Sequence, residues 1–125
     1  MNLKTLLIIK AIVCLLGVPV LLWTVPFYGL FGVELDAEGV YPAWQYGSSL
    51  IGILLLCWFA RNVTGFEMRR AIIIGLFVYD LLGFAVTLYA LLTNAVGALG
   101  WIIAGIYLLL TLGFGYFLLT LKKTA

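Results

Sequence analysis

Histidine is absent from this chain of 125 residues, and charged side chains make up only 10% of it. Without histidine, the usual axial ligand of haem and the commonest protein ligand of zinc and copper are missing. A typical soluble domain carries roughly 25% charged residues. The scarcity of charge therefore argues against an ordinary soluble enzyme, a disordered chain and a nucleic-acid-binding protein.

Cysteine is almost absent as well. Cys14 and Cys57 stand alone in apolar runs, without the paired spacing of a metal or redox site, so we expect both to pack as small hydrophobic residues. The sequence also contains no nucleophile–base pair and no phosphate-binding glycine loop. It therefore predicts no enzyme, no bound metal and no cofactor.

What the chain has in excess is apolar surface. Hydrophobic residues make up 66% of it, and its mean hydropathy is +1.23. A domain this small has too little interior to bury so much apolar surface. The composition predicts an integral membrane protein whose main partner is the lipid bilayer.

A spanning helix needs about 20 mostly apolar residues, and four stretches qualify. They are residues 5–30, 43–60, 71–93 and 98–120. None of them alternates apolar with polar residues, as strands of a membrane barrel would. We therefore predict an all-α fold with a single transmembrane domain over residues 1–125, in which four helices form an antiparallel up-down bundle.

Basic residues predict the orientation of this bundle. The joint at residues 34–39 has three acids and no base, and the joint at residues 93–97 is uncharged. All basic side chains fall on the opposite side: Lys4, Lys10, Arg61, Arg69, Arg70, Lys122 and Lys123. The positive-inside rule then predicts that both termini lie in the cytoplasm.

The first helix has two possible registers. Residues 5–24 and residues 11–32 are both long enough to span, and the earlier register carries Lys10 into the inner leaflet. Pro19 is expected to kink either version, and residues 27–33 are expected on the outer surface. A cleaved signal peptide is the alternative for this segment, but no small-residue cleavage site follows it, so we expect an uncleaved helix.

Asp80 is the main candidate for function. It lies ten residues after Arg70, which places it about 15 Å deep, near the bilayer midplane. A carboxylate at this depth costs roughly 2.5–3.5 kcal/mol on insertion scales, so it is expected to face polar partners inside the bundle. The side chains that could serve are Lys10, Tyr79, Thr87, Tyr107 and Thr111.

Two interpretations of Asp80 stay open. In one, it binds a proton, a cation or the polar group of a ligand. In the other, it is a neutral, hydrogen-bonded strut between helices. In both cases we expect Asp80 to be protonated at neutral pH, unless Lys10 or a bound cation lies against it.

Small residues predict where helices pack. Lipid tails are as apolar as leucine, so close backbone approach favours helix association in membranes. The candidate packing residues are Ser48, Gly52, Gly83, Ala104 and Gly115. They are expected to pack within the bundle or against another subunit.

Several short segments carry a family resemblance. Gly17-x-Pro19, LFGVELD at residues 30–36, YGSSLIGILLLCWFAR at residues 46–61 and ALGW at residues 98–101 resemble small four-helix bacterial membrane proteins near the DoxX type. The resemblance implies a four-helix bundle in the cytoplasmic (inner) membrane of a bacterium and a role beside larger membrane complexes. It supplies no catalytic or binding residues.

Together these features predict a structural or accessory binding subunit, self-associated as a homo-oligomer or docked on another membrane protein. The first alternative is a small proton or cation channel or transporter that uses Asp80. The second is a binder of lipid or of another apolar ligand. A second polar residue close to Asp80 would favour transport. A dry, sealed pocket would favour the subunit, and a cleft that opens sideways between helices would favour the ligand binder.

Overall fold

The computed structural model of the protein describes residues 2–121, and within this range the chain is helical without strands. The helices are α1 (Leu3–Cys14), α2 (Gly17–Leu22), α3 (Thr24–Gly29), α4 (Ala37–Phe59), α5 (Phe66–Leu92) and α6 (Gly100–Thr120). Four helical stretches are long and apolar enough to cross a membrane: Leu3–Leu22, Ala37–Phe59, Phe66–Leu92 and Gly100–Thr120. The all-helical class and the four membrane-length helices are thus confirmed, whereas Lys122 and Lys123 lie outside the described residues.

Prolines divide the first apolar stretch into three helices. Proline has no N–H, and its ring crowds the carbonyl four residues earlier. Pro19 disturbs the helix at Leu15, directly after α1 ends, and Pro26 disturbs it at Leu22, where α2 ends. The membrane-length part runs from Leu3 to Leu22, so it matches the earlier of the two predicted registers.

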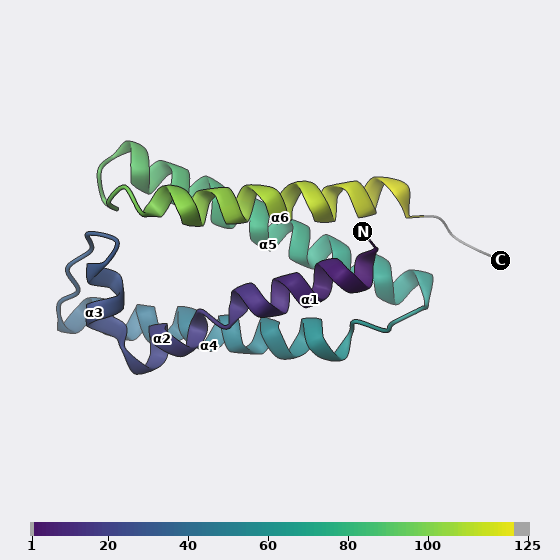
Figure 1. The fold of residues 1–125 in the computed structure, drawn as a ribbon, viewed down its shortest axis with the longest axis horizontal. Coiled ribbons are helices and arrows are strands. Elements are labelled where there is room, and N and C mark those ends of the chain that lie inside the picture. The colour runs from purple at the N-terminus through teal and green to yellow at the C-terminus, as the bar shows by residue number, and fades with distance from the viewer. Residues whose placement is uncertain (1, 122–125) are drawn as a thin grey trace.

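The helices form two layers (Figure 1). One layer consists of α5 and α6, which pack along each other and are joined by the short segment at residues 93–99. In the other layer, α4 packs against α1 and α2. The start of α1, the end of α4, the start of α5 and the end of α6 all lie at the same end of the molecule (Figure 1).

The hydrophobic core lies toward that common end. Its buried residues come from both layers: Leu3, Leu6, Leu7, Ala11, Cys57, Ile73, Leu76, Leu110 and Phe114. Cys14 and Cys57 are both free and buried, as expected for packing residues. The core fixes the layers at this end, and the opposite half of the molecule is packed less densely around a cavity described below.

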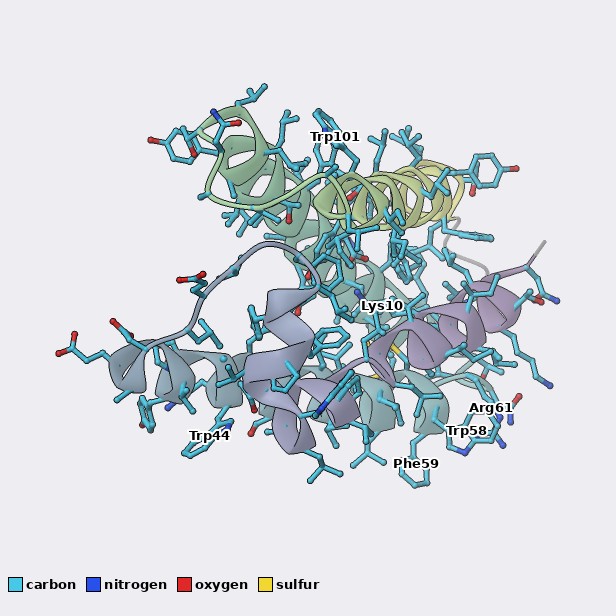
Figure 2. The ribbon with its side chains drawn as sticks, turned by 60° about the vertical axis from the view of Figure 1, so that its left-hand side comes forward. Lys10, Trp44, Trp58, Phe59, Arg61 and Trp101 are labelled. Carbon is cyan, nitrogen blue, oxygen red and sulfur yellow. The ribbon has the colours of Figure 1, made fainter. Side chains whose placement is uncertain are left out.

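The outward surface is largely apolar. Leu22, Phe59 and Leu119 are more exposed than most side chains, at 82%, 77% and 88%. Trp44, Trp58 and Trp101 also point away from the helices, whereas Lys10 points inward (Figure 2). In water such a surface would be an aggregation hazard, but acyl chains would solvate it.

Only some of the predicted packing residues contact another helix. Ala104 is buried, and a Cβ atom on Gly83 or Gly115 would lie 2.5 Å from Tyr107 or 3.1 Å from Phe77. Gly52 is exposed, and a Cβ atom on it would have no neighbour within 4 Å. Ser48 is exposed as well. The prediction that Ser48 and Gly52 pack inside the bundle is therefore wrong for this chain, and contact with another subunit stays a prediction for them.

The close crossing of α2 and α4 uses different glycines. A Cβ atom on Gly17 would lie 2.9 Å from the carbonyl oxygen of Gly47, and one on Gly47 would lie 2.9 Å from side-chain atoms of Val20 and Leu21. Gly47 precedes Ser48 by one residue, which is a turn of about 100° around the helix. The sequence therefore identified the right part of α4 but the wrong face.

Candidate functional site

A buried ion pair joins the two layers. The ammonium of Lys10 on α1 donates a hydrogen bond to Oδ1 of Asp80 on α5, and the two side chains are 1% and 0% exposed. The earlier register of the first helix makes this contact possible. The exception stated for Asp80 therefore applies, because a cationic partner lies against it.

Aromatic rings surround the lysine. The Nζ atom of Lys10 lies 4.7 Å from the ring centroid of Tyr79 and 5.8 Å from that of Tyr107. Both positions are within the range in which an aromatic face attracts a cation. The two rings therefore stabilise the ammonium in addition to Asp80.

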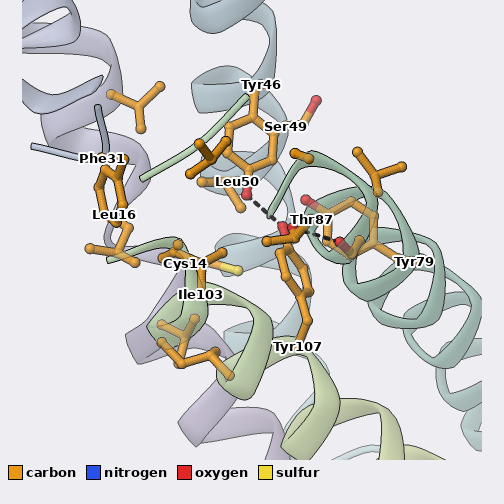
Figure 3. A pocket seen from close by; sticks show the side chains of 18 of the residues that line it. Cys14, Leu16, Phe31, Tyr46, Ser49, Leu50, Tyr79, Thr87, Ile103 and Tyr107 are labelled. Carbon is orange, nitrogen blue, oxygen red and sulfur yellow. Dashed lines mark hydrogen bonds between the residues drawn. The ribbon is translucent and has the colours of Figure 1, made fainter. Parts of the chain in front are cut away.

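Three tyrosine hydroxyls lie near this ion pair. The hydroxyls of Tyr46 on α4 and Tyr107 on α6 are 2.5 Å apart and share a hydrogen bond (Figure 3). The hydroxyl of Tyr79 is buried and has no hydrogen-bond partner among residues 2–121, and neither does Oδ2 of Asp80. Buried polar atoms nearly always have a partner. Of these two residues only Tyr79 lines the cavity described below, so only Tyr79 can face a ligand there.

The remaining predicted partners of Asp80 are satisfied within their own helices. Thr87 donates to the carbonyl oxygen of Gly83 at 2.7 Å, and Thr111 donates to that of Tyr107 at 2.7 Å. The structure thus brings Lys10, Tyr79 and Tyr107 together around Asp80, whereas Thr87 and Thr111 do not contribute to this cluster.

A cavity of about 540 Å³ lies between the two layers, with the tyrosines and Lys10 along it. Most of its lining is aliphatic or aromatic and comes from the helices of both layers, including Leu16, Leu50 and Ile103 (Figure 3). A cavity of this size and composition, with a few polar groups in it, is typical of small-molecule sites.

We infer from the exposed residues in its lining that the cavity opens sideways between α4 and α5. These helices follow each other in the chain but are not among the helix pairs that pack closely. Tyr46 and Ser49 on α4, and Leu82 and Val86 on α5, all line the cavity and are nevertheless exposed. An opening flanked by Leu82 and Val86 would face acyl chains if these helices span a bilayer.

A short cap covers one end of the cavity. Phe27, Tyr28 and Phe31, from α3 and the turn after it, line the cavity, and the N–H of Gly97 donates to the carbonyl oxygen of Phe31. Gly32 has a φ of +73°, which favours glycine. Burial raises the pKa of the Tyr28 hydroxyl, so it remains a neutral donor. Part of the segment at residues 27–33 thus lines the cavity, and its place on the outer surface of the membrane stays a prediction.

Sequence reasoning missed several of these residues. Tyr46 was not among the candidate partners of Asp80, and Cys14 was assigned to packing alone. Within residues 2–121, no group of three or more histidine, cysteine, aspartate or glutamate side chains could hold a metal ion. The chemistry of the site therefore consists of hydrogen bonding from phenols and an ammonium at one side of an apolar chamber.

Comparison with known proteins adds no family. No family model, no curated protein and no solved structure matches this sequence. The resemblance to small membrane proteins near the DoxX type thus stays a prediction.

Proposed function

We propose that this protein binds an uncharged, lipid-soluble molecule that has an apolar body and one polar end. The observation that carries this proposal is the apolar cavity of about 540 Å³ that opens between α4 and α5 beside buried tyrosine hydroxyls. Of the three roles considered from the sequence, a sideways opening favours the binder of an apolar ligand. The molecule would enter from the bilayer rather than from water.

The charges of the site favour an uncharged ligand. Lys10 and Asp80 neutralise each other, so the cavity offers no net charge to a charged headgroup. A charged group without a partner in a low-dielectric interior is costly. The tyrosine hydroxyls, in contrast, can donate without carrying a charge, and Tyr79 and Tyr107 both line the cavity, which suits a carbonyl, ether or hydroxyl oxygen on the ligand.

A substitution at the opening tests ligand binding. Val86→Trp adds a large ring at the edge of the cavity, whereas Val78→Trp adds the same ring at an exposed position on α5 that does not line it. The probe is a long-chain ketone that carries a photoreactive diazirine. We expect the wild type and Val78→Trp to be crosslinked to similar extents, and Val86→Trp to be crosslinked several-fold less.

Peptide mapping provides the second readout of the same experiment. Crosslinks are expected at cavity-lining residues such as Ile103 and Leu110, and an excess of unlabelled ketone should compete with them. Equal labelling of all three proteins, or labelling confined to the outward faces of the helices, would contradict a binding cavity.

The binding model includes an orientation in the membrane. We propose that all four helices span, that both termini lie in the cytoplasm, and that residues 34–39 and 93–97 lie outside. The basic residues Arg61, Arg69 and Arg70 near the junction of α4 and α5 support this orientation. The cavity opening would then face the midplane and the outer leaflet.

Cysteine labelling tests the orientation. Ala37 and Asn62 are exposed and lie near opposite ends of α4, and the native cysteines are buried, which limits background labelling. In intact cells, we expect a membrane-impermeant maleimide to label Ala37→Cys but not Asn62→Cys. After the cells are lysed, both variants should react. If only Asn62→Cys is labelled in intact cells, the protein has the opposite orientation in the membrane.

The other two roles have less support, although Lys10 is a second polar residue beside Asp80 and so meets the criterion given above for transport. A proton or cation that binds to Asp80 would first have to displace the ammonium of Lys10, which already neutralises the carboxylate. Proton or cation flux in liposomes that Asp80→Asn abolishes would favour the transporter over our proposal. The accessory-subunit role is compatible with ligand binding, because the exposed Ser48 and Gly52 would allow another membrane protein to approach α4 closely.

A further inference from the structure

A second, smaller cavity lies at the basic end of the molecule, away from the ion pair. Its volume is about 250 Å³, and it is formed where α1 begins, where α4 connects to α5, and on the first turns of α5. Its lining residues are Asn2, Leu3, Lys4, Arg61, Asn62, Val63 and Arg69. Within the described part of the chain, this lining has three basic side chains and no acidic one.

Arg61 is held in position by its neighbours. Its guanidinium lies 3.9 Å from the ring of Trp58, and one of its nitrogens donates to the carbonyl oxygen of Trp58 at 2.6 Å. A guanidinium has five N–H donors, so most of them stay available. Because this contact already orders the side chain, binding an anion would cost less conformational entropy.

Arg69 supplies an unpartnered donor. Its Nε atom is buried, and it has no hydrogen-bond partner among residues 2–121. A buried donor that belongs to a charged group is costly when it has no acceptor. Arg69 also lines the cavity, so an anion there would meet its guanidinium, whose planar geometry matches that of phosphate oxygens.

We propose that this cavity, formed by Lys4, Arg61 and Arg69, binds a phosphate group, carried either by an anionic phospholipid or by a free ion. The start of α1 adds positive potential, because helix N-termini attract anions. Leu3 and Val63 line the same cavity and would suit the glycerol region of a lipid. The proposal is independent of what the larger cavity binds.

Native mass spectrometry of the detergent-solubilised protein tests the proposal. The probes are phosphatidylglycerol and phosphatidylcholine of identical acyl chains. We expect phosphatidylglycerol to remain bound to the wild type, and Arg61→Gln or Arg69→Gln to lower its occupancy about fivefold each, as expected for one basic group near a membrane surface. Arg70→Gln is the matched control, because Arg70 is exposed and does not line the cavity.

Inorganic phosphate distinguishes the two sources. If millimolar phosphate alone raises the melting temperature of the wild type but not of Arg61→Gln, the free ion is a ligand of the site. If only phosphatidylglycerol does so, the ligand is the lipid. Both results support the phosphate site.

Three results would overturn it. They are equal retention of the two lipids, equal retention of phosphatidylglycerol by Arg70→Gln and Arg61→Gln, and binding that survives the combined replacement of Lys4, Arg61 and Arg69 by glutamine. Size-exclusion profiles and helical circular dichroism verify that each variant is folded. Arg61→Lys retains the charge and should retain most of the lipid, which separates loss of charge from loss of structure.

Discussion

Asp80→Asn is expected to destabilise the protein by about 3–5 kcal/mol, the range measured when one partner of a buried ion pair is removed. The substitution preserves the size of the side chain but leaves the ammonium of Lys10 buried without a counter-charge. The rings of Tyr79 and Tyr107 would compensate only in part, since cation–π contacts contribute about 0.5–2 kcal/mol. The free energy of unfolding in mixed micelles, measured from denaturant titrations, checks this value.

Two control variants show whether the loss comes from charge. Glu67→Gln removes the charge of an exposed carboxylate on the same helix and should change the free energy of unfolding by less than about 0.5 kcal/mol. The double variant Lys10→Met/Asp80→Leu replaces the ion pair with apolar groups and should regain most of the stability, because such replacements are often neutral or stabilising.

Opposite results would identify a different role for Asp80. If Asp80→Asn unfolds as the wild type does, Asp80 acts as a neutral strut, as one interpretation of the sequence had it. If the double variant is as unstable as Asp80→Asn, the lost stability comes from packing around position 80 rather than from an uncompensated ammonium.

The sequence was informative about depth along each helix. Length and hydropathy predicted four membrane-length helices, and the depth of Asp80 led to Lys10 as its only basic candidate. The missing step was the register of the first helix. That register depends on where Pro19 and Pro26 interrupt the chain. The position of a proline shows where a helix is kinked, but it does not show whether the membrane-spanning part lies before or after the kink.

The sequence was much less informative about rotation around each helix. In water, a helix shows its buried face as an apolar stripe, but the outward faces here are as apolar as the core, as Phe59 and Leu119 illustrate. Periodicity therefore could not separate Gly47 from Ser48, although only Gly47 packs against α2. The contact between Tyr46 and Tyr107 was hidden for the same reason, since it depends on the rotation of both helices.

The second large effect is expected at Gly83, where α5 lies against Tyr107. A Cβ atom at this position would lie 2.5–2.8 Å from ring atoms of Tyr107, closer than any real contact. Tyr107 is itself held by the hydrogen bond to Tyr46 and by burial. Any side chain larger than glycine must therefore displace the ring or separate α5 from α6.

Gly83→Leu should consequently lower the free energy of unfolding by about 1–3 kcal/mol, the usual range for an overpacked core, and should reduce crosslinking by the diazirine ketone. Gly75→Leu is the matched control on the same helix, because a Cβ atom there has no neighbour within 4 Å. Leucine is a better helix former than glycine by up to about 1 kcal/mol, so the control should be neutral or slightly stabilising. If both substitutions have the same effect, the ring of Tyr107 moves aside freely, and the wall of the cavity that it forms is not rigid enough to select a ligand by shape.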